Sequence, residues 1–485
     1  LSPPPSIGRF DSFRSGLFLY PVSILSTQSP TDSALALGRS SIGKLLMQYS
    51  LPAIIASLAT SLYNIVDSVF IGRGVGSMAI TGLAITFPLM NLVVAFCVLV
   101  AVGGATISSI FLGQKSLDKA ADVVGNITLL CLVHAIVITV AGLVWLDPIL
   151  CFFGATDATI VYAREFMQVI LLATPMTYVF LGLNNLMRAT GYPRKAMVSA
   201  LLSVGVNIVV APLFIFVLDM GIRGAALATV FGQVSAFVWV LFHFCSRKST
   251  VHFTRRCWKL SPDVLRHVYA IGLSPFLMNC CACMVVVFVN KALLGSAGDD
   301  GNLAVGAYGI INRTSMFFVM IIFGVTQGMQ PILGYNYGAA DWFRVRATLN
   351  RGIFIATAVS VIGFALTELM PNVISSMFTT DDGMIAIARR GFRIFFLFYP
   401  CVGAQIVIQN YFQSIGRPAW SIFLSLTRQL IFLIPLLAIL PGRYGVDGVW
   451  MAMCSSDIIA FALALVTMLV INRRIGRELQ QRARL

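Results

Sequence analysis

Residues 45–72 read LLMQYSLPAIIASLATSLYNIVDSVFIG. This run is long enough to cross a bilayer as one helix, because about 20 apolar residues span the hydrocarbon core. Its one carboxylate, Asp67, would cost about 3 kcal/mol or more if it faced lipid as a charge. We therefore expect Asp67 to face a protein-lined or water-filled cavity and to bind a proton or a cation there. Pro52 removes one backbone hydrogen bond, so we expect a hinge at that residue.

The rest of the chain has the same character as this run. Of its 485 residues, 58% are hydrophobic and 11% are charged, and the mean hydropathy is +0.88. Soluble domains carry about 25% charged residues, so the composition predicts an all-α integral membrane protein. The net charge of +15 does not indicate nucleic acid, because the basic residues lie in alternate loops. The lipid bilayer is the expected partner, and we expect a monomer without cofactors.

Twelve apolar runs predict twelve transmembrane helices. The first six runs cover residues 45–71, 79–112, 121–147, 159–190, 194–218 and 223–246. The second six cover residues 262–294, 303–334, 342–370, 384–415, 418–440 and 446–473. If the N-terminus lies inside, the inner segments carry 22 Lys and Arg and the outer segments carry 8. This bias predicts that both termini are cytoplasmic, in the inner membrane of a cell.

These runs divide the chain into two lobes with three flanking segments. Residues 1–40 are expected to be a disordered or non-native extension, since they are rich in Ser and Pro. Residues 41–247 form the predicted N-lobe, and residues 262–473 form the predicted C-lobe. A basic cytoplasmic linker, 248–261, joins them, and 474–485 is a basic cytoplasmic tail. The linker is expected either to contact anionic lipid headgroups or to be simply solvated.

The two halves repeat each other at a nearly constant separation along the chain. Gly191-Tyr192-Pro193 matches Gly416-Arg417-Pro418, and Pro52 matches Pro275 at almost the same separation. An even number of helices in each half gives parallel, pseudo-symmetric repeats, and such proteins hold a substrate between lobes that rock. Asp67 aligns with Asn290, so the acid is present in the first lobe alone. This asymmetry assigns ion coupling to the N-lobe.

Polar residues within the apolar runs are the candidate site residues. Tyr63 and Asn64 lie four and three residues before Asp67, so they are expected to share its helix face. The other N-lobe candidates for ion coupling are Asn184, Asn207 and Thr229. A carboxylate with amide and hydroxyl oxygens suits a proton or a hard cation such as sodium, and no other metal is expected. The alternative is that these side chains only join helices by hydrogen bonds.

The C-lobe contributes a different set of residues. Arg313, Arg428 and Asp457 lie in apolar runs, and Asp457 is expected to pair with one of the two arginines, as a structural pair or a gate. The candidate residues of a substrate cavity are Gln327, Gln330, Gln409 and Met176. Glutamines accept varied ligands and methionines form pliable apolar walls, although helix packing alone would also explain each of them.

The chain resembles the multidrug and toxic compound extrusion (MATE) transporters, in particular their DinF-like bacterial branch. The resemblance covers residues 40–472 and rests on motifs in both halves. They include Leu51-Pro52, Tyr63 to Gly72, Gly103-Gly104-Ala105, Arg188-Ala189-Thr190-Gly191, Asn207 to Pro212, Gln327 to Pro331 and Gln413 to Gly416. It implies twelve helices in two lobes that open as a V, and export of organic, often cationic, compounds against proton or sodium flow.

The resemblance also implies roles for particular residues. The coupling acid maps onto Asp67 and the bending proline onto Pro52. The fifth-helix pattern Asn-x-x-x-Asp-Pro maps onto residues 207–212, where this chain has Ala211 in place of the second acid. One remaining carboxylate suits a proton better than sodium, so we favour proton coupling while sodium stays open.

Three rival functions can be weighed against this one. A flippase for lipid-linked glycans, with the same fold, would need a cationic groove for phosphate, which Arg313 or Arg428 would have to supply. An enzyme would need clustered acids, histidines or metal ligands near a bilayer surface, and the sequence offers none. A channel fits the broken symmetry of the two repeats less well than alternating access does. The sequence therefore favours an antiporter for a small-molecule substrate.

Overall fold

The computed structural model describes residues 30–246, 249–298 and 301–482, and this part of the chain is helical without strands. Eleven helices are long and apolar enough to cross a membrane. A twelfth span is the pair α13 and α14, which bends by 58° between its two halves. The predicted all-α fold with twelve transmembrane segments is confirmed in this form.

The N-lobe contains six long helices and short pieces between them. Its elements are α2 (Ile42–Gly74), α3 (Ser77–Gly113), α4 (Leu117–Val144), α5 (Leu146–Phe152), α6 (Ile160–Ala189), α7 (Pro193–Pro212), the π-helical turn η1 (Leu213–Val217) and α8 (Gly221–Cys245). The helix α1 (Pro30–Arg39) precedes them, and the 3-10 turn η2 (Arg255–Trp258) lies in the connection to the C-lobe.

The C-lobe repeats this plan with more interruptions. Its elements are α9 (Pro262–Ser296), α10 (Gly301–Gly338), α11 (Trp342–Leu369), α12 (Pro371–Ser376), α13 (Asp382–Phe395), α14 (Tyr399–Ser414), α15 (Pro418–Leu426), the π-helical η4 (Thr427–Leu433), α16 (Ile434–Ile439), α17 (Pro441–Tyr444) and α18 (Val446–Arg482). The single run predicted at 384–415 is broken just before Pro400, which cannot donate a backbone hydrogen bond.

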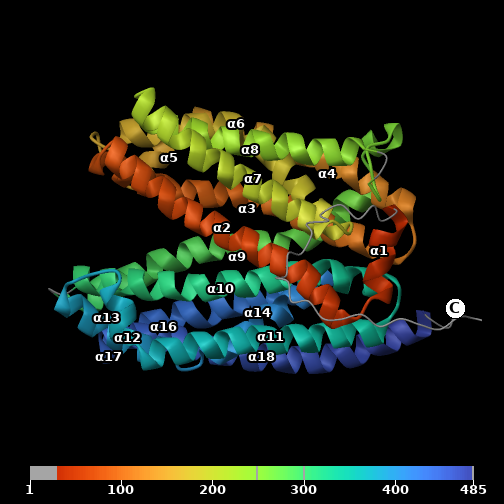
Figure 1. Ribbon diagram of the computed structural model, residues 1–485. Helices are drawn as coiled ribbons and strands as arrows, with labels where there is room; N and C mark the ends of the chain where they lie inside the picture. The colour runs from red at the N-terminus through yellow and green to blue at the C-terminus, as the bar shows by residue number, and fades with distance from the viewer. Residues whose placement is uncertain (1–29, 247–248, 299–300, 483–485) are drawn as a thin grey trace, which may run out of the picture.

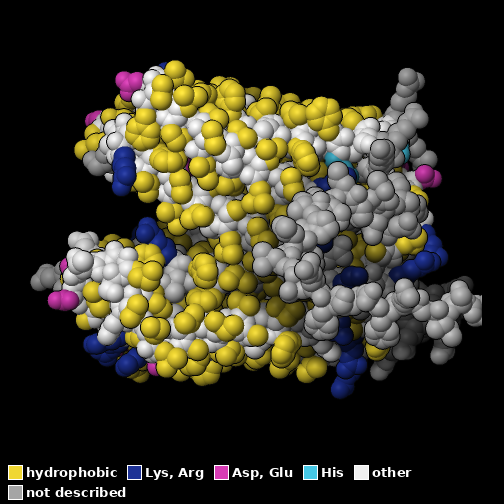
Figure 2. Space-filling model, in the orientation of Figure 1, with side chains coloured by type: hydrophobic (Ala, Val, Ile, Leu, Met, Phe, Trp, Pro, Cys, Tyr) yellow, Lys and Arg dark blue, Asp and Glu magenta, His cyan; other side chains and the backbone are white. Residues whose placement is uncertain are grey.

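The two lobes lie one above the other in Figure 1 and meet at one end. Both α1 and the C-terminal end of α18 lie at that end, which we call the closed end. At the opposite end, where α12, α13 and α17 lie, Figure 2 shows a hollow between the lobes. We call this the open end. The structure thus agrees with the two lobes predicted from the repeats and with the V-shaped opening that the family resemblance implied.

Three flanking segments differ from the sequence-based prediction. Residues 30–39, within the extension predicted to be disordered, form α1, and Leu37 is fully buried against the C-lobe. Residues 1–29 lie outside the described part of the chain. The connection between the lobes is also ordered: Val251 and Cys257 are buried, and Phe253 stacks on Trp258 with 5.5 Å between ring centroids. We call residues 249–261 the connector, which is packed rather than freely solvated. The C-terminal helix α18 continues beyond the predicted boundary at 473.

Glycines bring the lobes into backbone contact at the closed end. A Cβ atom on Gly113 of α3 would lie 1.9 Å from the carbonyl oxygen of Tyr335 on α10. The symmetric contact joins Gly338 to the carbonyl oxygen of Ile110, where a Cβ atom would lie 2.1 Å away. Gly113 and Gly338 occupy equivalent positions in the two halves of the sequence, and so do Ile110 and Tyr335. The sequence repeat is therefore also a repeat of contacts.

The helices α3 and α9 make the closest approach of this kind. A Cβ atom on Gly272 would lie 1.6 Å from the carbonyl oxygen of Leu99, and one on Gly103 would lie 2.1 Å from that of Val268. A backbone oxygen cannot rotate away as a side chain can, so any larger residue must push the two helices apart. The closed end therefore depends on these glycines.

We predict that Gly272→Ala lowers the free energy of unfolding by about 1–3 kcal/mol, the usual cost of overpacking. The control is Gly205→Ala on α7, where an added Cβ atom meets nothing within 4 Å. That change should be neutral or stabilising by up to about 1 kcal/mol, because Ala favours a helix over Gly. Thermal unfolding in detergent measures both, and equal effects would contradict the prediction.

Candidate functional site

Asp67 lies near the open end of α2, seven residues before the end of the helix. Its residue is 6% exposed, so protein rather than lipid surrounds it. Its Oδ1 atom is buried without a hydrogen-bond partner among the described residues. A buried carboxylate oxygen without a partner is costly, and binding a proton or a cation would relieve that cost.

A hydrogen-bonded cluster from three helices lies beside this acid. The hydroxyl of Thr229 on α8 donates to the carbonyl oxygen of Ala225 at 3.2 Å. Its oxygen accepts from Asn207 Nδ2 on α7 at 3.1 Å, and Tyr63 Oη on α2 lies 2.9 Å from it. Because Thr229 has one proton and gives it to Ala225, Tyr63 must be the donor in the last bond. Tyr63 is also an electrostatic neighbour of Asp67.

Helix direction explains why these residues meet. The chain enters α7 at the closed end and α8 at the open end, so Asn207 and Thr229 both lie toward the open end, as Asp67 does. The π-helical turn η1 follows Pro212 and packs on the end of α2, where Phe70 and Phe216 make an edge-on contact of 6.3 Å. This turn fixes α7 against the half of α2 that carries Asp67.

Two of the predicted ion-coupling residues lie outside this cluster. Asn184 donates to Ser199 Oγ at 2.6 Å and to the carbonyl oxygen of Ala196 at 2.9 Å. It is five residues from the closed end of α6, so its depth differs from that of Asp67 and it does not join the cluster beside the acid. Asn64 is exposed, and the structure does not bring it into the hydrogen-bonded cluster.

Pro52 lies in a continuous helix and borders a small cavity of about 30 Å³. Asn184, Arg188 and Gln327 line the same cavity. Arg188 on α6 donates to Gln327 Oε1 on α10, which joins the two lobes, and to Asn185 Oδ1 at 3.4 Å. Arg188 lies near the end of the apolar run predicted at 159–190. Its position inside the run 159–190 was the signal that it is partly buried.

The other predicted cavity residues are not among those that line the small cavity at Pro52. Gln330 is 8% exposed and donates to Thr106 Oγ1 on α3 at 2.7 Å, a second polar bond between the lobes. Gln409 is equally buried and donates to Met278 Sδ at 3.2 Å, whereas Met176 is exposed. In this conformation the side chains of Gln330 and Gln409 thus bond between helices.

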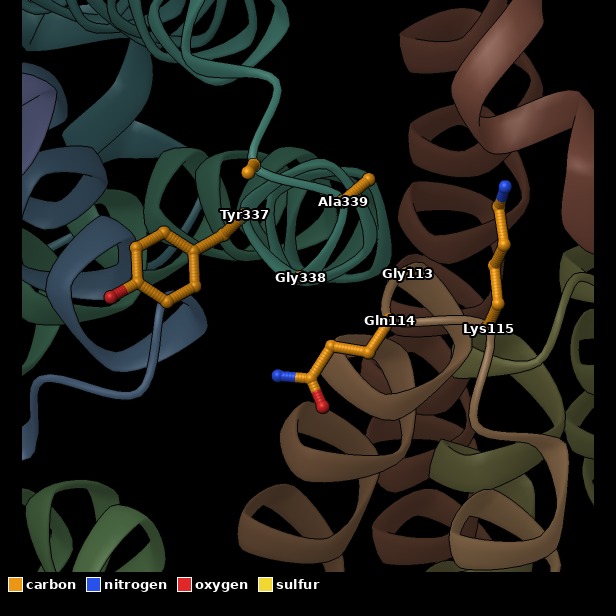
Figure 3. A pocket seen from close by; sticks show the side chains of 7 residues that line it. Gly113, Gln114, Lys115, Tyr337, Gly338 and Ala339 are labelled. Carbon is orange, nitrogen blue, oxygen red and sulfur yellow. The ribbon is translucent and has the colours of Figure 1, made fainter. Parts of the chain in front are cut away.

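A larger hollow of about 380 Å³ lies at the closed end between the turns that follow α3 and α10. Gly113, Gln114, Lys115 and Tyr337 line it, together with Gly338, Ala339 and Ala340. In Figure 3, Gln114 and Tyr337 come from the two different lobes, and the Lys115 side chain extends away from Gln114. The hollow lies at the boundary between the lobes, and none of the residues that line it is a predicted site residue.

The C-lobe has its own buried acid, and this one is paired. Arg428 Nε on η4 donates to Asp457 Oδ1 on α18 at 2.7 Å. The prediction that Asp457 pairs with one of the two arginines is confirmed for Arg428. Arg313 is exposed on α10 and is not the partner of Asp457.

Two six-helix lobes that touch at one end of a membrane-spanning bundle, with an unpaired acid buried in one lobe, define a two-lobed membrane transporter. The family model described as MatE matches residues 52–213 and 271–439, one stretch in each lobe. The chain therefore belongs to the MATE family, as its sequence motifs had indicated.

Curated relatives match over nearly the whole chain. The multidrug export protein MepA of Staphylococcus haemolyticus is 27% identical over 435 residues, which cover 90% of this chain and 95% of MepA. MepA of Staphylococcus aureus strain NCTC 8325 is 26% identical over 441 residues, with the same shares covered.

Solved structures match at the level of the fold. A multidrug resistance MATE family transporter in an outward-facing conformation superposes with a TM-score of 0.86 at 22% identity, covering 91% of this chain and 98% of that one. A MOP superfamily transporter from Pyrococcus furiosus gives the same values. The two-lobed fold is therefore shared with solved transporters.

We predict that Arg428→Met lowers the free energy of unfolding by about 3–5 kcal/mol, because it leaves the buried Asp457 carboxylate without its partner. The control is Arg223→Met, whose ion pair with Glu165 is solvent-exposed on the arginine side and is worth about 0–1 kcal/mol. Thermal unfolding in detergent compares the loss of stability in Arg428→Met with that in Arg223→Met. The double change Arg428→Met with Asp457→Leu should recover much of the loss.

Proposed function

We propose that this protein is a secondary active antiporter that exports organic, cationic or amphipathic drug-like compounds in exchange for protons. The observation that carries the proposal is the Asp67 carboxylate, which is buried in protein with one oxygen unpartnered among the described residues. The names of the multidrug export relatives support the class of cargo. The two-lobed fold supports alternating access as the route.

The hydrogen bonds around Asp67 favour a proton over sodium. Sodium would need several oxygen ligands, and one candidate in the cluster beside the acid is the hydroxyl oxygen of Thr229. Both lone pairs of that oxygen already accept hydrogen bonds, from Tyr63 and Asn207. The position of a second acid, one turn after Asn207, holds the fully buried Ala211. A proton needs only the carboxylate itself.

The transport cycle follows from neutralising this acid. Cargo enters the space between the lobes while the closed end is apart, and a proton from the other side then binds at Asp67. Protonated Asp67 becomes a hydrogen-bond donor, so its contacts within the Tyr63, Asn207 and Thr229 cluster change. The helix α2 bends near Pro52, the N-lobe part of the cavity narrows and cargo leaves through the open end.

The proposed orientation puts the open end outside the cell. The positive-inside bias supports this orientation, with both termini in the cytoplasm of a cell whose inner membrane holds the protein. In the structure α1 and the C-terminal end of α18 lie together at the closed end, which fits that orientation. In that orientation, the conformation in Figure 2 is outward-open.

The alternative function is a flippase for a lipid-linked glycan or a lipid. It requires free cationic side chains toward the space between the lobes. Arg428 is neutralised by Asp457, which removes one of the two arginines that would have supplied them. Arg313 is exposed and would have to serve instead.

We predict that Asp67→Asn abolishes coupled export while leaving membrane insertion and the amount of folded protein unchanged. The measurement is uptake or export of a panel of organic cations in proteoliposomes under imposed proton or sodium gradients. The control is Asp157→Asn, which changes an exposed acid. Proton-driven transport by the Asp67→Asn variant at the unmodified rate would refute the assignment, as would a lipid-linked glycan being the only substrate moved.

We predict that Ala211→Asp creates a sodium response that the unmodified protein lacks. The new carboxylate would lie one turn from Asn207, so two acids would share the site and repel each other until a cation joins them. Thermal stability of this variant should therefore rise in sodium chloride relative to choline chloride. Adding Asp67→Asn should remove the effect. Equal stability of Ala211→Asp in both salts would contradict the prediction.

A further inference from the structure

Each lobe begins with a helix whose first half is fastened to the other lobe. The helix α2 starts the N-lobe and α9 starts the C-lobe. Figure 1 shows α2 crossing from the upper lobe toward the lower one as it approaches the closed end. The fastenings involve polar side chains that the proposed function does not use.

The start of α2 is held on the C-lobe by Arg344 of α11 and Asn336 of α10. Arg344 Nη2 donates to the carbonyl oxygens of Ser40 at 2.7 Å and Leu37 at 3.0 Å. Arg344 Nε donates to Asn336 Oδ1 at 2.9 Å, and Asn336 Nδ2 donates to the Leu37 carbonyl at 3.2 Å. We call Arg344 and Asn336 the α1 clamp, because they hold the end of α1 and the turn before α2.

Backbone packing extends this attachment along α2 as far as Ile54. A Cβ atom on Gly328 of α10 would lie 2.6 Å from the amide nitrogen of Ser50, and one on Gly324 would lie 2.8 Å from the Cα atom of Ile54. On its other side, α2 borders the cavity of about 30 Å³ at Pro52. The first half of α2 therefore fits the C-lobe more closely than the N-lobe.

The start of α9 is held on the N-lobe in the corresponding way. Asn126 Nδ2 of α4 donates to the carbonyl oxygens of Lys259 at 3.1 Å and Cys257 at 3.3 Å. Asn126 Oδ1 accepts from the Ser261 amide at 2.9 Å. We call Asn126 the connector clamp, and Asn126 is 1% exposed. The glycine contacts of α9 with Leu99 and Gly103 of α3 continue the attachment.

The second halves of both helices return to their own lobes. On α2, Tyr63 bonds to Thr229 of the N-lobe. On α9, Ser274 Oγ lies 2.7 Å from Ser421 Oγ of the C-lobe, and Gln409 of α14 donates to Met278. The change of lobe falls near Pro275 in α9 and between Pro52 and Tyr63 in α2.

We propose that Arg344, Asn336 and Asn126 are positioning residues for the transport cycle, which hold the first halves of α2 and α9 on the opposite lobe while the lobes rock. Separation of the lobes at the closed end then bends α2 between Pro52 and Tyr63, and the bend reaches Asp67 through one helix. Without the α1 clamp, α2 would follow the N-lobe as a rigid rod. This inference rests on the proposed alternating access and adds the residues that connect the closed end to the acid.

Distances between spin labels test which segments move together. Four exposed positions serve as label sites, in a variant whose ten native cysteines are replaced and whose transport has been confirmed. They are Arg39 at the end of α1, Leu260 in the connector, Lys119 on α4 and Asn350 on α11. Pulsed electron resonance measures each pair in lipid nanodiscs at high and low pH and with Asp67→Asn.

We expect the start of each helix to keep its distance to the opposite lobe and to change its distance to its own lobe. The pairs Arg39 with Asn350 and Leu260 with Lys119 should keep one distance in all conditions. The pairs Arg39 with Lys119 and Leu260 with Asn350 should change between conditions. The opposite pattern, in which Arg39 moves with Lys119, would overturn the proposal. If no pair changes at all, alternating access fails and the proposal fails with it.

Removing the α1 clamp provides the second test. Arg344→Ala should lower proton-driven transport several-fold with normal amounts of folded protein, and it should make the Arg39 to Asn350 distance vary with pH. Arg344→Lys should restore little, because an ammonium group cannot reproduce the forked contact with two carbonyls. The control is Arg346→Ala, an exposed neighbour on α11. Normal transport by Arg344→Ala with a constant distance would overturn the proposal.

Discussion

The structure depends on how a carboxylate is accommodated where water is scarce. Within the described part of the chain, Asp67 is buried in the first lobe and Asp457 in the second. Asp457 has Arg428 at 2.7 Å, so its charge is balanced within the protein. Asp67 has amides and hydroxyls around it that are bonded to one another. A buried charge without a counter-charge must be neutralised by something that can arrive and leave. Under the proposed function, this difference makes the C-lobe carboxylate a fixed structural charge and the N-lobe carboxylate the one that responds to the coupling ion.

The sequence predicted the architecture well because bilayer thickness and repeat spacing are both strong constraints. The twelve apolar runs and the constant spacing of the repeat indicated the lobes and their order. The break before Pro400 was missed because a proline that starts a helix after a bend looks the same in sequence as one inside a span. The order of α1 was missed because its fastening comes from Arg344, which lies in the other half of the chain.

The sequence predicted the members of the candidate site only in part. Asp67, Tyr63, Asn207 and Thr229 could be grouped by residue type, and the structure brings Tyr63, Asn207 and Thr229 together beside the acid. Asn184 was grouped with them although it lies near the other end of its helix. Residue type carries no information about depth, whereas the direction of each helix does. Counting residues from the start of each span, with alternate direction, would have separated Asn184 from the acid.

The paired glycine contacts at Gly113 and Gly338 have a consequence for ancestry. The two contacts join equivalent helix ends, one from each lobe. This is the arrangement of an isologous interface about a two-fold axis. A half-length ancestor with this helix end could have paired with a second copy of itself through the same contact. Fusion of two such genes would then have required only a linker between two subunits that already paired, and no new contact surface at the closed end. Later divergence, such as an acid kept in one copy and lost from the other, could proceed without disturbing the joint.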